Sequence, residues 1–391
     1  MPFELLWLLL PVAAASGYLV AKRESKRSAN TPSYELPQDY YKGLNYILNE
    51  QPDKAIDIFL RLSELDDSTL ELHLSLGNLF RKRGEVDRAI RLHQSLVNHP
   101  SISTSLYNSA LQELAQDYMS AGLLDRAENL CLELVDADKQ NLPALRLLRE
   151  LYQQEKEWFR AIDVTRKIAV CSDESYGVVI AHYYCELAEG AKQKNDAIQA
   201  HRMLEKAHQE DSGCARATIL KAEIERQAGS LESAIGIYQS LEHTAPEYLP
   251  EVLEMMSICY QTLGWQEKMV AYLKRILSNH HAVELVLMAT RMLKELEGEA
   301  AALSFLGAEV VKRPSLRGVQ YLLELDINQL GENTGHLSLV KSSLDKLLTN
   351  KPVYRCNTCG FTGMEMHWCC PSCKGWSSIK PIQEFQWGAS I

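Results

Sequence analysis

The chain has 391 residues, 46% of them hydrophobic, so it is long enough to bury an extensive core. Its 41 basic and 51 acidic residues give a net charge of −10, which disfavours nucleic acid as a partner, because phosphate binding needs clustered Lys and Arg. Outside the C-terminal segment the cysteines stand singly, which indicates free thiols in a reducing compartment and no disulfide framework: Cys131, Cys171, Cys185, Cys214 and Cys259.

The first predicted element is a transmembrane anchor over residues 1–21. The stretch FELLWLLLPVAAASGYLVA has about 19 mostly apolar residues, just enough to cross a bilayer. A polar juxtamembrane linker, residues 22–35, follows with the four basic residues that determine topology: Lys22, Arg23, Lys26 and Arg27. By the positive-inside rule they place the rest of the chain in the cytoplasm. A cleaved signal peptide and a buried soluble helix are the alternatives, and a signal peptide would carry its basic residues before the apolar run.

Residues 36–350 contain a repeat of small and aromatic residues. Gly43 and Ala55 recur as Gly77 and Ala89, an offset of 34 residues at both positions. That is the tetratricopeptide period, in which small residues allow the two helices of a unit to approach each other. The pattern returns downstream at Ala115, Tyr118 and Ala127; Tyr152 and Ala161; Ala188, Ala200 and Ala207; Ala222, Ala234, Tyr238 and Pro246; Tyr260 and Met269; and Ala289, Ala301 and Ala308.

The repeat region therefore predicts an all-α solenoid of about eight units. A degenerate helical pair near Leu316 to Leu348 is expected to cap the array. Strand signals are almost absent, and four glycines fall where the first helix of a unit should end: Gly84, Gly122, Gly229 and Gly264. Solenoids of this kind leave a long groove that usually holds proteins or peptides.

No segment carries a motif of the main enzyme classes, so we predict that the protein is not an enzyme. P-loop, GxGxxG, HExxH and GxSxG patterns are all missing from the sequence. Within the second repeat, SLGNLFRKRGEVDRAIRLHQ, the side chains of Asn78, Arg81 and Lys82 are predicted to lie on the inner face and to bind a partner. A solvated helix face is the alternative reading of these three residues.

The C-terminal segment, residues 351–391, contains two cysteine pairs with the spacing of a metal site. Cys356 and Cys359 enclose two residues, as do Cys370 and Cys373, and ten residues separate the pairs. Four thiolates arranged tetrahedrally suit one zinc or iron ion. Cys369 is predicted to pack or to lie at the surface, because ligation through it would break the two-residue spacing.

We call residues 351–391 the ribbon and each cysteine pair with its turn a knuckle. Two further expectations concern how the ribbon is held. The segment is rich in aromatic residues, which are predicted to supply rigid bulk around the metal: Tyr354, Phe361, Trp368, Trp376, Phe385 and Trp387. The short connection at Lys351 and Pro352 predicts that the ribbon folds back on the last repeats.

The knuckles resemble those of rubredoxins. Rubredoxins separate the two knuckles by a much longer stretch, and this difference places an electron-transfer role in doubt.

Along nearly its whole length the chain resembles the bacterial lipopolysaccharide assembly protein B family. The resemblance is carried by LLLPVAAA in the anchor, LGNLFRKRGEVDRAIR in the second repeat, and YRCNTCGF, CPSC and WSSIKPI at the end. It implies a single-pass bacterial inner-membrane protein that restrains lipopolysaccharide synthesis as an adaptor. The implied partners are a membrane-bound AAA+ metalloprotease, the committed-step UDP-3-O-acyl-N-acetylglucosamine deacetylase that it degrades, and other inner-membrane lipopolysaccharide proteins.

Two other functions stay open at this point. A scaffold would hold the enzymes of lipopolysaccharide synthesis or transport without changing their lifetimes. An iron redox protein would cycle its cluster between oxidation states. The sequence also leaves open whether the protein forms a homodimer.

Overall fold

The computed structural model describes residues 38–48, 51, 54–55, 57–58, 67–100, 102–172, 174–280, 282–330, 335–349 and 351–382. The chain divides into two compact units, one ending at Lys139 and the other beginning at Gln140. Within the described ranges no helix is both long and apolar enough to cross a membrane. The predicted anchor and its linker, with the four topology-determining residues, lie outside those ranges.

The first unit consists of helices that pack against their neighbours along the chain. These are α2 (Gln38–Leu48), α4 (Asp67–Lys82), α5 (Val86–Val97), α6 (Thr104–Ser120) and α7 (Leu124–Ala137). α4 packs on α5 and α6 packs on α7, as expected for repeat units. Gly77 of α4 lies so close to His93 of α5 that a Cβ atom there would be 2.2 Å from the ring nitrogen Nε2. This close approach explains the glycine at position 77.

The second unit continues the same alternation of paired helices. Its helices are α8 (Leu142–Gln154), α9 (Trp158–Cys171), α10 (Gly177–Gln193), α11 (Ala197–Glu210), α12 (Ala215–Gln227), α13 (Leu231–Thr244), the 3-10 helix η2 (Pro246–Tyr248), α14 (Leu249–Thr262), α15 (Gln266–Ile276), α16 (Val283–Glu297), α17 (Glu299–Lys312), α18 (Leu316–Leu330) and α19 (Gly335–Leu348). The predicted degenerate pair is present as α18 and α19, and no residue of α19 is fully buried.

The turn between the two helices of a unit has the same backbone conformation in six successive units. Two residues after the first helix ends, the backbone adopts a positive φ: at Gly84, Gly122, Lys156, Asn195, Gly229 and Gly264. A left-handed residue at this position ends a helix and allows the chain to reverse. The sequence identified the four glycines, but not Lys156 and Asn195, because neither residue type signals a left-handed turn as strongly as glycine does.

The small residues of the repeat pattern lie in the core, with one exception. The predicted alanines from Ala89 to Ala289 that mark successive units are buried on facing helices. In the eighth unit the prediction of Ala301 and Ala308 was wrong, because Ala302 is the fully buried alanine and Ala308 is exposed. α17 is therefore rotated by about one residue from the register that the spacing indicated.

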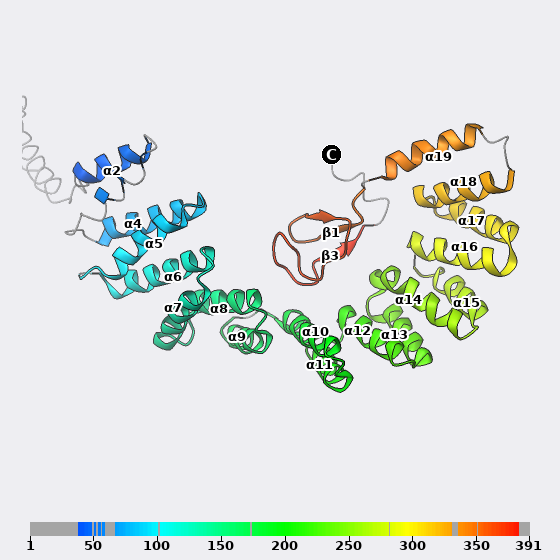
Figure 1. Cartoon of the computed structure of the whole chain (residues 1–391), viewed down its shortest axis with the longest axis horizontal. Coiled ribbons are helices and arrows are strands. Elements are labelled where there is room, and N and C mark those ends of the chain that lie inside the picture. The colour runs from blue at the N-terminus through cyan, green and yellow to red at the C-terminus, as the bar shows by residue number, and fades with distance from the viewer. Residues whose placement is uncertain are drawn as a thin grey trace, which may run out of the picture. The chain divides into compact units, whose positions relative to one another are not determined.

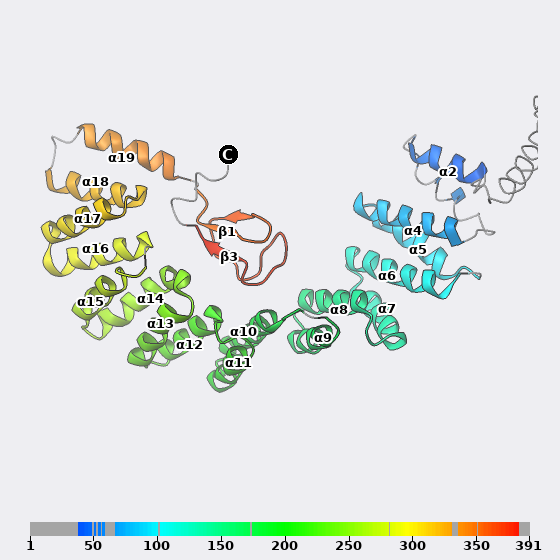
Figure 2. The same cartoon turned by 180° about the vertical axis from the view of Figure 1, so that it is seen from behind.

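After α19 the chain forms a small three-stranded antiparallel ribbon. Its strands are β1 (Tyr354–Cys356), β2 (Thr362–Gly363) and β3 (Ile379–Pro381), in the order β2-β1-β3. Figure 1 shows the ribbon beside helices of its own unit, and Figure 2 shows the same arrangement from behind. β3 contacts η2 directly, so the ribbon packs on the repeats.

Candidate metal centre

The four predicted ligands come together at one point of the ribbon. The sulfur atoms of Cys356, Cys359, Cys370 and Cys373 all lie within 4.8 Å of one another. The Sγ–Sγ distance is 3.7 Å between Cys356 and Cys373 and again between Cys359 and Cys370. Zinc–sulfur bonds of about 2.3 Å in a tetrahedron require sulfurs about 3.8 Å apart, so the site fits a zinc or an iron ion. Among the described residues, no other group of His, Cys, Asp and Glu side chains is close enough to share a metal.

The local sequence shapes each knuckle through backbone hydrogen bonds. The Gly360 amide donates to the carbonyl of Cys356, and the Lys374 amide donates to the carbonyl of Cys370. Gly360 and Lys374 both follow the second cysteine of their pair, and both have a positive φ, 77° and 58°. The two knuckles therefore have the same turn, although only the first has the glycine that such a backbone favours.

Hydrogen bonds at two of the four sulfurs, Cys356 and Cys359, favour the thiolate form that a metal requires. The Ser378 hydroxyl lies 3.3 Å from Cys356 Sγ, and hydrogen bonding with it lowers the pKa of the Cys356 thiol to about 5. The backbone amide of Phe361 lowers the pKa of Cys359. Cys369 lies apart from the cluster, half-buried, with its sulfur 3.5 Å from the carbonyl of Lys374. This arrangement agrees with the prediction that Cys369 is not a ligand.

Polar contacts hold the ribbon against η2 and α14. The Tyr354 hydroxyl donates to Glu251 at 2.7 Å, and the Tyr248 hydroxyl donates to the carbonyl of Ile379 at 3.3 Å. Lys380 donates to Glu247 at 2.8 Å. Burial raises the pKa of Tyr354, as does the adjacent carboxylate, so its hydroxyl stays protonated and able to donate.

Aromatic rings form the rest of the contact between ribbon and repeats. The ring of Trp376 stacks on His182 of α10 with centroids 5.0 Å apart, and it meets Tyr183 edge-on at 5.8 Å. Trp368 lies 5.1 Å from Tyr248 and 5.9 Å from His182. His182 is fully buried, and desolvation lowers its pKa to about 3, so it is a neutral ring within this stack.

Two sequence expectations about the ribbon need correction. The ribbon was expected to fold back on the last repeats, but its aromatic and hydrogen-bond contacts are with η2 and with α9, α10, α12 and α14, which are middle repeats. Trp368 and Trp376 were expected to surround the metal, but their rings contact the repeats instead. Tyr354 and Phe361 do pack beside the knuckle cysteines, whereas Phe385 and Trp387 lie outside the described residues.

The three residues predicted to bind a partner lie on α4 in the first unit. Arg81 is occupied within the protein, since its guanidinium pairs with Asp117 at 2.7 Å and with Glu113 at 2.6 Å. Asn78 is half-buried and Lys82 is exposed. A role of these residues in partner binding stays a prediction, and for Arg81 it would require breaking two ion pairs.

Sequence reasoning missed the repeat residues on which the ribbon rests. Trp158, His182 and Tyr248 contact it from three separate elements, and Arg216 of α12 lies 5.9 Å from the Trp376 ring. None of them belongs to a spaced motif. Their only unusual signal is chemical, because a histidine and an arginine are seldom buried in a repeat core without a reason.

Both the repeats and the ribbon match known protein families. Residues 354–381 match the family described as rubredoxin metal binding domain, and residues 72–100 and 185–248 match families described as tetratricopeptide repeat. Lipopolysaccharide assembly protein B of Escherichia coli is 37% identical over 382 residues, covering 97% of this chain and 98% of that protein. The chain belongs to the lipopolysaccharide assembly protein B family. Another member of the family, from Haemophilus influenzae, is 34% identical over 393 residues, covering 97% and 98%.

Similarity to solved structures is much weaker. A tetratricopeptide repeat protein from Parabacteroides merdae has a TM-score of 0.34 at 13% identity, covering 71% of this chain and 99% of that chain. A MamA protein has a TM-score of 0.33 at 19% identity, covering 46% and 93%. Scores this low add nothing to the assignment, which rests on the helices, the thiolate cluster and the sequence matches.

Proposed function

We propose that this protein is an adaptor that regulates lipopolysaccharide biosynthesis, anchored in the bacterial inner membrane by residues 1–21 with its repeats in the cytoplasm. Its repeats would bring the committed-step UDP-3-O-acyl-N-acetylglucosamine deacetylase to a membrane-bound AAA+ protease and so shorten the lifetime of the deacetylase. The observation that carries the proposal is a metal ribbon seated on a repeat array, in a chain that matches members of the family over 97% of its length.

Each part of the chain has a role in this proposal. An array of paired helices presents surface for protein binding and needs no catalytic group of its own. Anchoring would confine that surface to the plane in which a membrane protease works, which raises the effective concentration of the two partners. The metal, held by the four thiolates, would keep the ribbon folded and therefore seated on the repeats.

The test is the half-life of the deacetylase after translation is stopped. We expect the half-life to lengthen in cells that lack this protein, and to stay long in cells that carry Cys370→Ser. Cys369→Ser is the matched control and should restore rapid turnover, because its sulfur lies outside the thiolate cluster. An unchanged half-life in all strains would reject the adaptor role.

A scaffold for lipopolysaccharide enzymes is the second candidate, favoured by the same repeat surface. It would leave the half-life of the deacetylase unchanged, while purification of the protein from its own membranes would recover other enzymes of the pathway. An iron redox role is distinguished by spectroscopy, since only an iron-loaded cluster would show a reversible change in visible absorption on reduction.

A further inference from the structure

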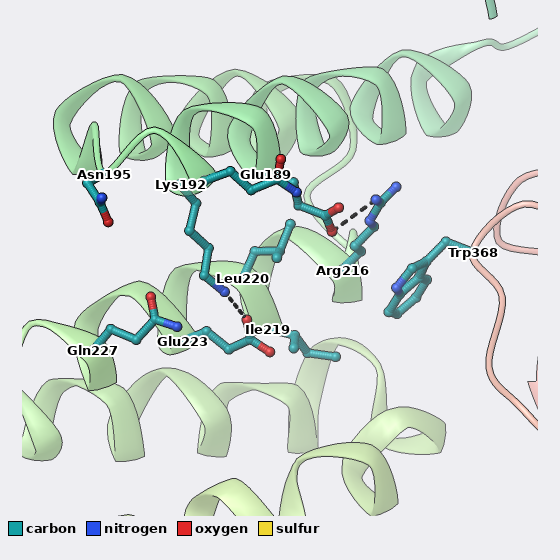
Figure 3. A pocket seen from close by; sticks show the side chains of 10 residues that line it. Glu189, Lys192, Asn195, Arg216, Ile219, Leu220, Glu223, Gln227 and Trp368 are labelled. Atoms are coloured by element: carbon teal, nitrogen blue, oxygen red, sulfur yellow. Dashed lines mark hydrogen bonds and ion pairs between the residues drawn. The ribbon is translucent and has the colours of Figure 1, made fainter. Parts of the chain in front are cut away.

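One cavity of the second unit has walls from both the repeats and the ribbon. Its volume is about 500 Å³, and it lies between α10 and α12 with Trp368 of the ribbon at one end (Figure 3). Ile219 and Leu220 of α12 provide an apolar floor beside that ring. The thiolate cluster is not part of the cavity, so this is a second candidate site.

The accessible charge in and around this cavity is acidic. Lys192 pairs with Glu223, while Arg216 pairs with Glu189 at 3.0 Å and with Glu186 at 2.8 Å. Three carboxylates therefore face two cations. The side chains of the two cations, Arg216 and Lys192, are 5% and 23% exposed, whereas those of Glu189 and Glu223 are 36% and 30% exposed. A ligand entering the cavity would meet carboxylate oxygens more readily than cationic groups, which suits a positively charged ligand.

The cavity wall also contains donors that lack an acceptor. Arg216 atoms Nε and Nη1 are buried, and in the described part of the chain neither has a hydrogen-bond partner. Leaving such donors unpaired is unfavourable, because their lost hydration is not replaced. Because these two atoms are buried, the polar contacts to a ligand come from the exposed groups of the cavity. At the other end, the exposed side chains of Asn195 and Gln227 can donate to and accept from a peptide backbone.

The indole ring of Trp368 adds a surface that suits a positively charged side chain. An indole face attracts an ammonium or guanidinium group, and the attraction is stronger where water is excluded. The alkyl stem of lysine or arginine would at the same time cover Ile219 and Leu220. The cavity thus combines an aromatic wall, an apolar floor and two accessible carboxylates.

We propose that this cavity binds an extended segment of a partner protein through a lysine or arginine side chain. The side chain would lie against Trp368 with its charge near Glu189 and Glu223. This inference rests on the proposed function for the expectation that the repeats hold a partner protein, and it names the site and the chemistry of the bound segment. Because Trp368 belongs to the ribbon, the site is complete only while the ribbon is seated.

The test is selection from a random dodecapeptide library displayed on phage, against the metal-loaded, detergent-solubilised full chain. We expect selected peptides to share a lysine or arginine flanked by uncharged residues. Replacing that residue with norleucine in a synthetic peptide should weaken binding about tenfold, or about 1.4 kcal/mol. Glu223→Gln should weaken binding similarly, and Trp368→Ala should remove it.

Glu232→Gln is the matched control, because Glu232 lies exposed on α13 outside the cavity. Metal content and helical content are measured for each variant. If Trp368→Ala releases the ribbon, Glu223→Gln remains as the test of the cavity. The proposal is overturned if no peptides are enriched, if the selected peptides are acidic or purely apolar, or if binding survives Glu223→Gln unchanged. If no such peptides bind but the half-life of the deacetylase still depends on the protein, only the proposal for the cavity is rejected. If such peptides are enriched but the half-life of the deacetylase is unchanged, only the adaptor role is rejected.

Discussion

The ribbon buries three side chains in its own core, Cys356, Cys370 and Ile379, and two of these are predicted metal ligands. The repeats from α12 to α18 instead share one continuous cluster of buried Leu, Ile, Val, Met, Tyr and Ala side chains. A core as small as that of the ribbon cannot offset the entropy of ordering its loops without a metal or a supporting surface. The repeats can fold by apolar burial, whereas the ribbon depends on the metal and on the repeats beneath it.

This difference indicates why the ribbon places its largest rings outside its own core. Trp376 and Trp368 contact His182 and Tyr248 of the repeats, so the ribbon gains at the contact the apolar burial that it lacks internally. A change in metal loading would therefore alter the surface of the middle repeats. Four experiments can break or sharpen the comparison.

The largest expected effect is that of Cys370→Ser on the ribbon alone. Removal of one thiolate should abolish stoichiometric metal binding, since structural zinc sites of this type contribute on the order of 10 kcal/mol to folding. Helical content should be retained, because no metal ligand belongs to the repeat core. Metal analysis and far-ultraviolet circular dichroism measure the two quantities. Cys369→Ser should keep its metal, and loss of the helices in Cys370→Ser would contradict the independence of the repeats.

Trp376→Ala is expected to release the ribbon from the repeats while the metal stays bound. The indole contacts Trp158, His182 and Tyr183, so truncation should weaken the contact by about 3 kcal/mol. Amide hydrogen exchange should become faster in β3 and in α10. Trp265→Ala is the control, because that ring packs on the repeat core, and its effect should appear near α15. Unchanged exchange in Trp376→Ala would show that the polar contacts alone hold the ribbon.

Gly77→Ala tests the repeats without touching the ribbon. The new methyl group would meet the ring of His93, so we expect the first unit to lose about 1–3 kcal/mol of stability with metal content unchanged. Thermal unfolding followed by circular dichroism measures the loss. Gly190→Ala on α10 meets no atom within 4 Å and should be neutral or stabilising by up to about 1 kcal/mol. Equal stability of the two variants would refute the close approach of α4 and α5.

The smallest expected effect, over the measured range from about pH 7.5 to 5.5, is a pH dependence at the contact. The pKa of His182 is about 3 in the folded protein, below its ordinary value of 6.5, so the unfolded chain binds an extra proton between these values. Stability should therefore fall as the pH drops below 6.5, by about 1.4 kcal/mol per pH unit, and the loss should end near pH 3.

His182→Phe keeps an aromatic ring against Trp376 but cannot titrate, so its stability should fall less between about pH 7.5 and 5.5. Urea unfolding at the two pH values, with metal content checked at each, measures the difference. His243→Phe replaces an exposed histidine and should retain the wild-type dependence. Identical slopes for the wild type and His182→Phe would mean that His182 is not buried as a neutral ring.

Features that depend on near neighbours in the chain were predictable. The two-residue spacing within each cysteine pair brings the sulfurs together by local turns, and the 34-residue period places small residues where paired helices meet. Features that depend on several distant elements were not. Arg81 pairs with residues of α6, and Lys156 adopts a left-handed turn that its residue type does not favour, at the position that glycine occupies in other units.

The sequence by itself determined an all-helical repeat array followed by a four-thiolate ribbon, since periodicity and ligand spacing act over short stretches of chain. Only the tertiary structure decided where the ribbon rests, which aromatic rings face the repeats, and that Trp368, Glu189 and Glu223 border one cavity. The physical reason is that such contacts join residues more than a hundred positions apart. Their energies come from matching shapes and charges, which no local pattern of residues records.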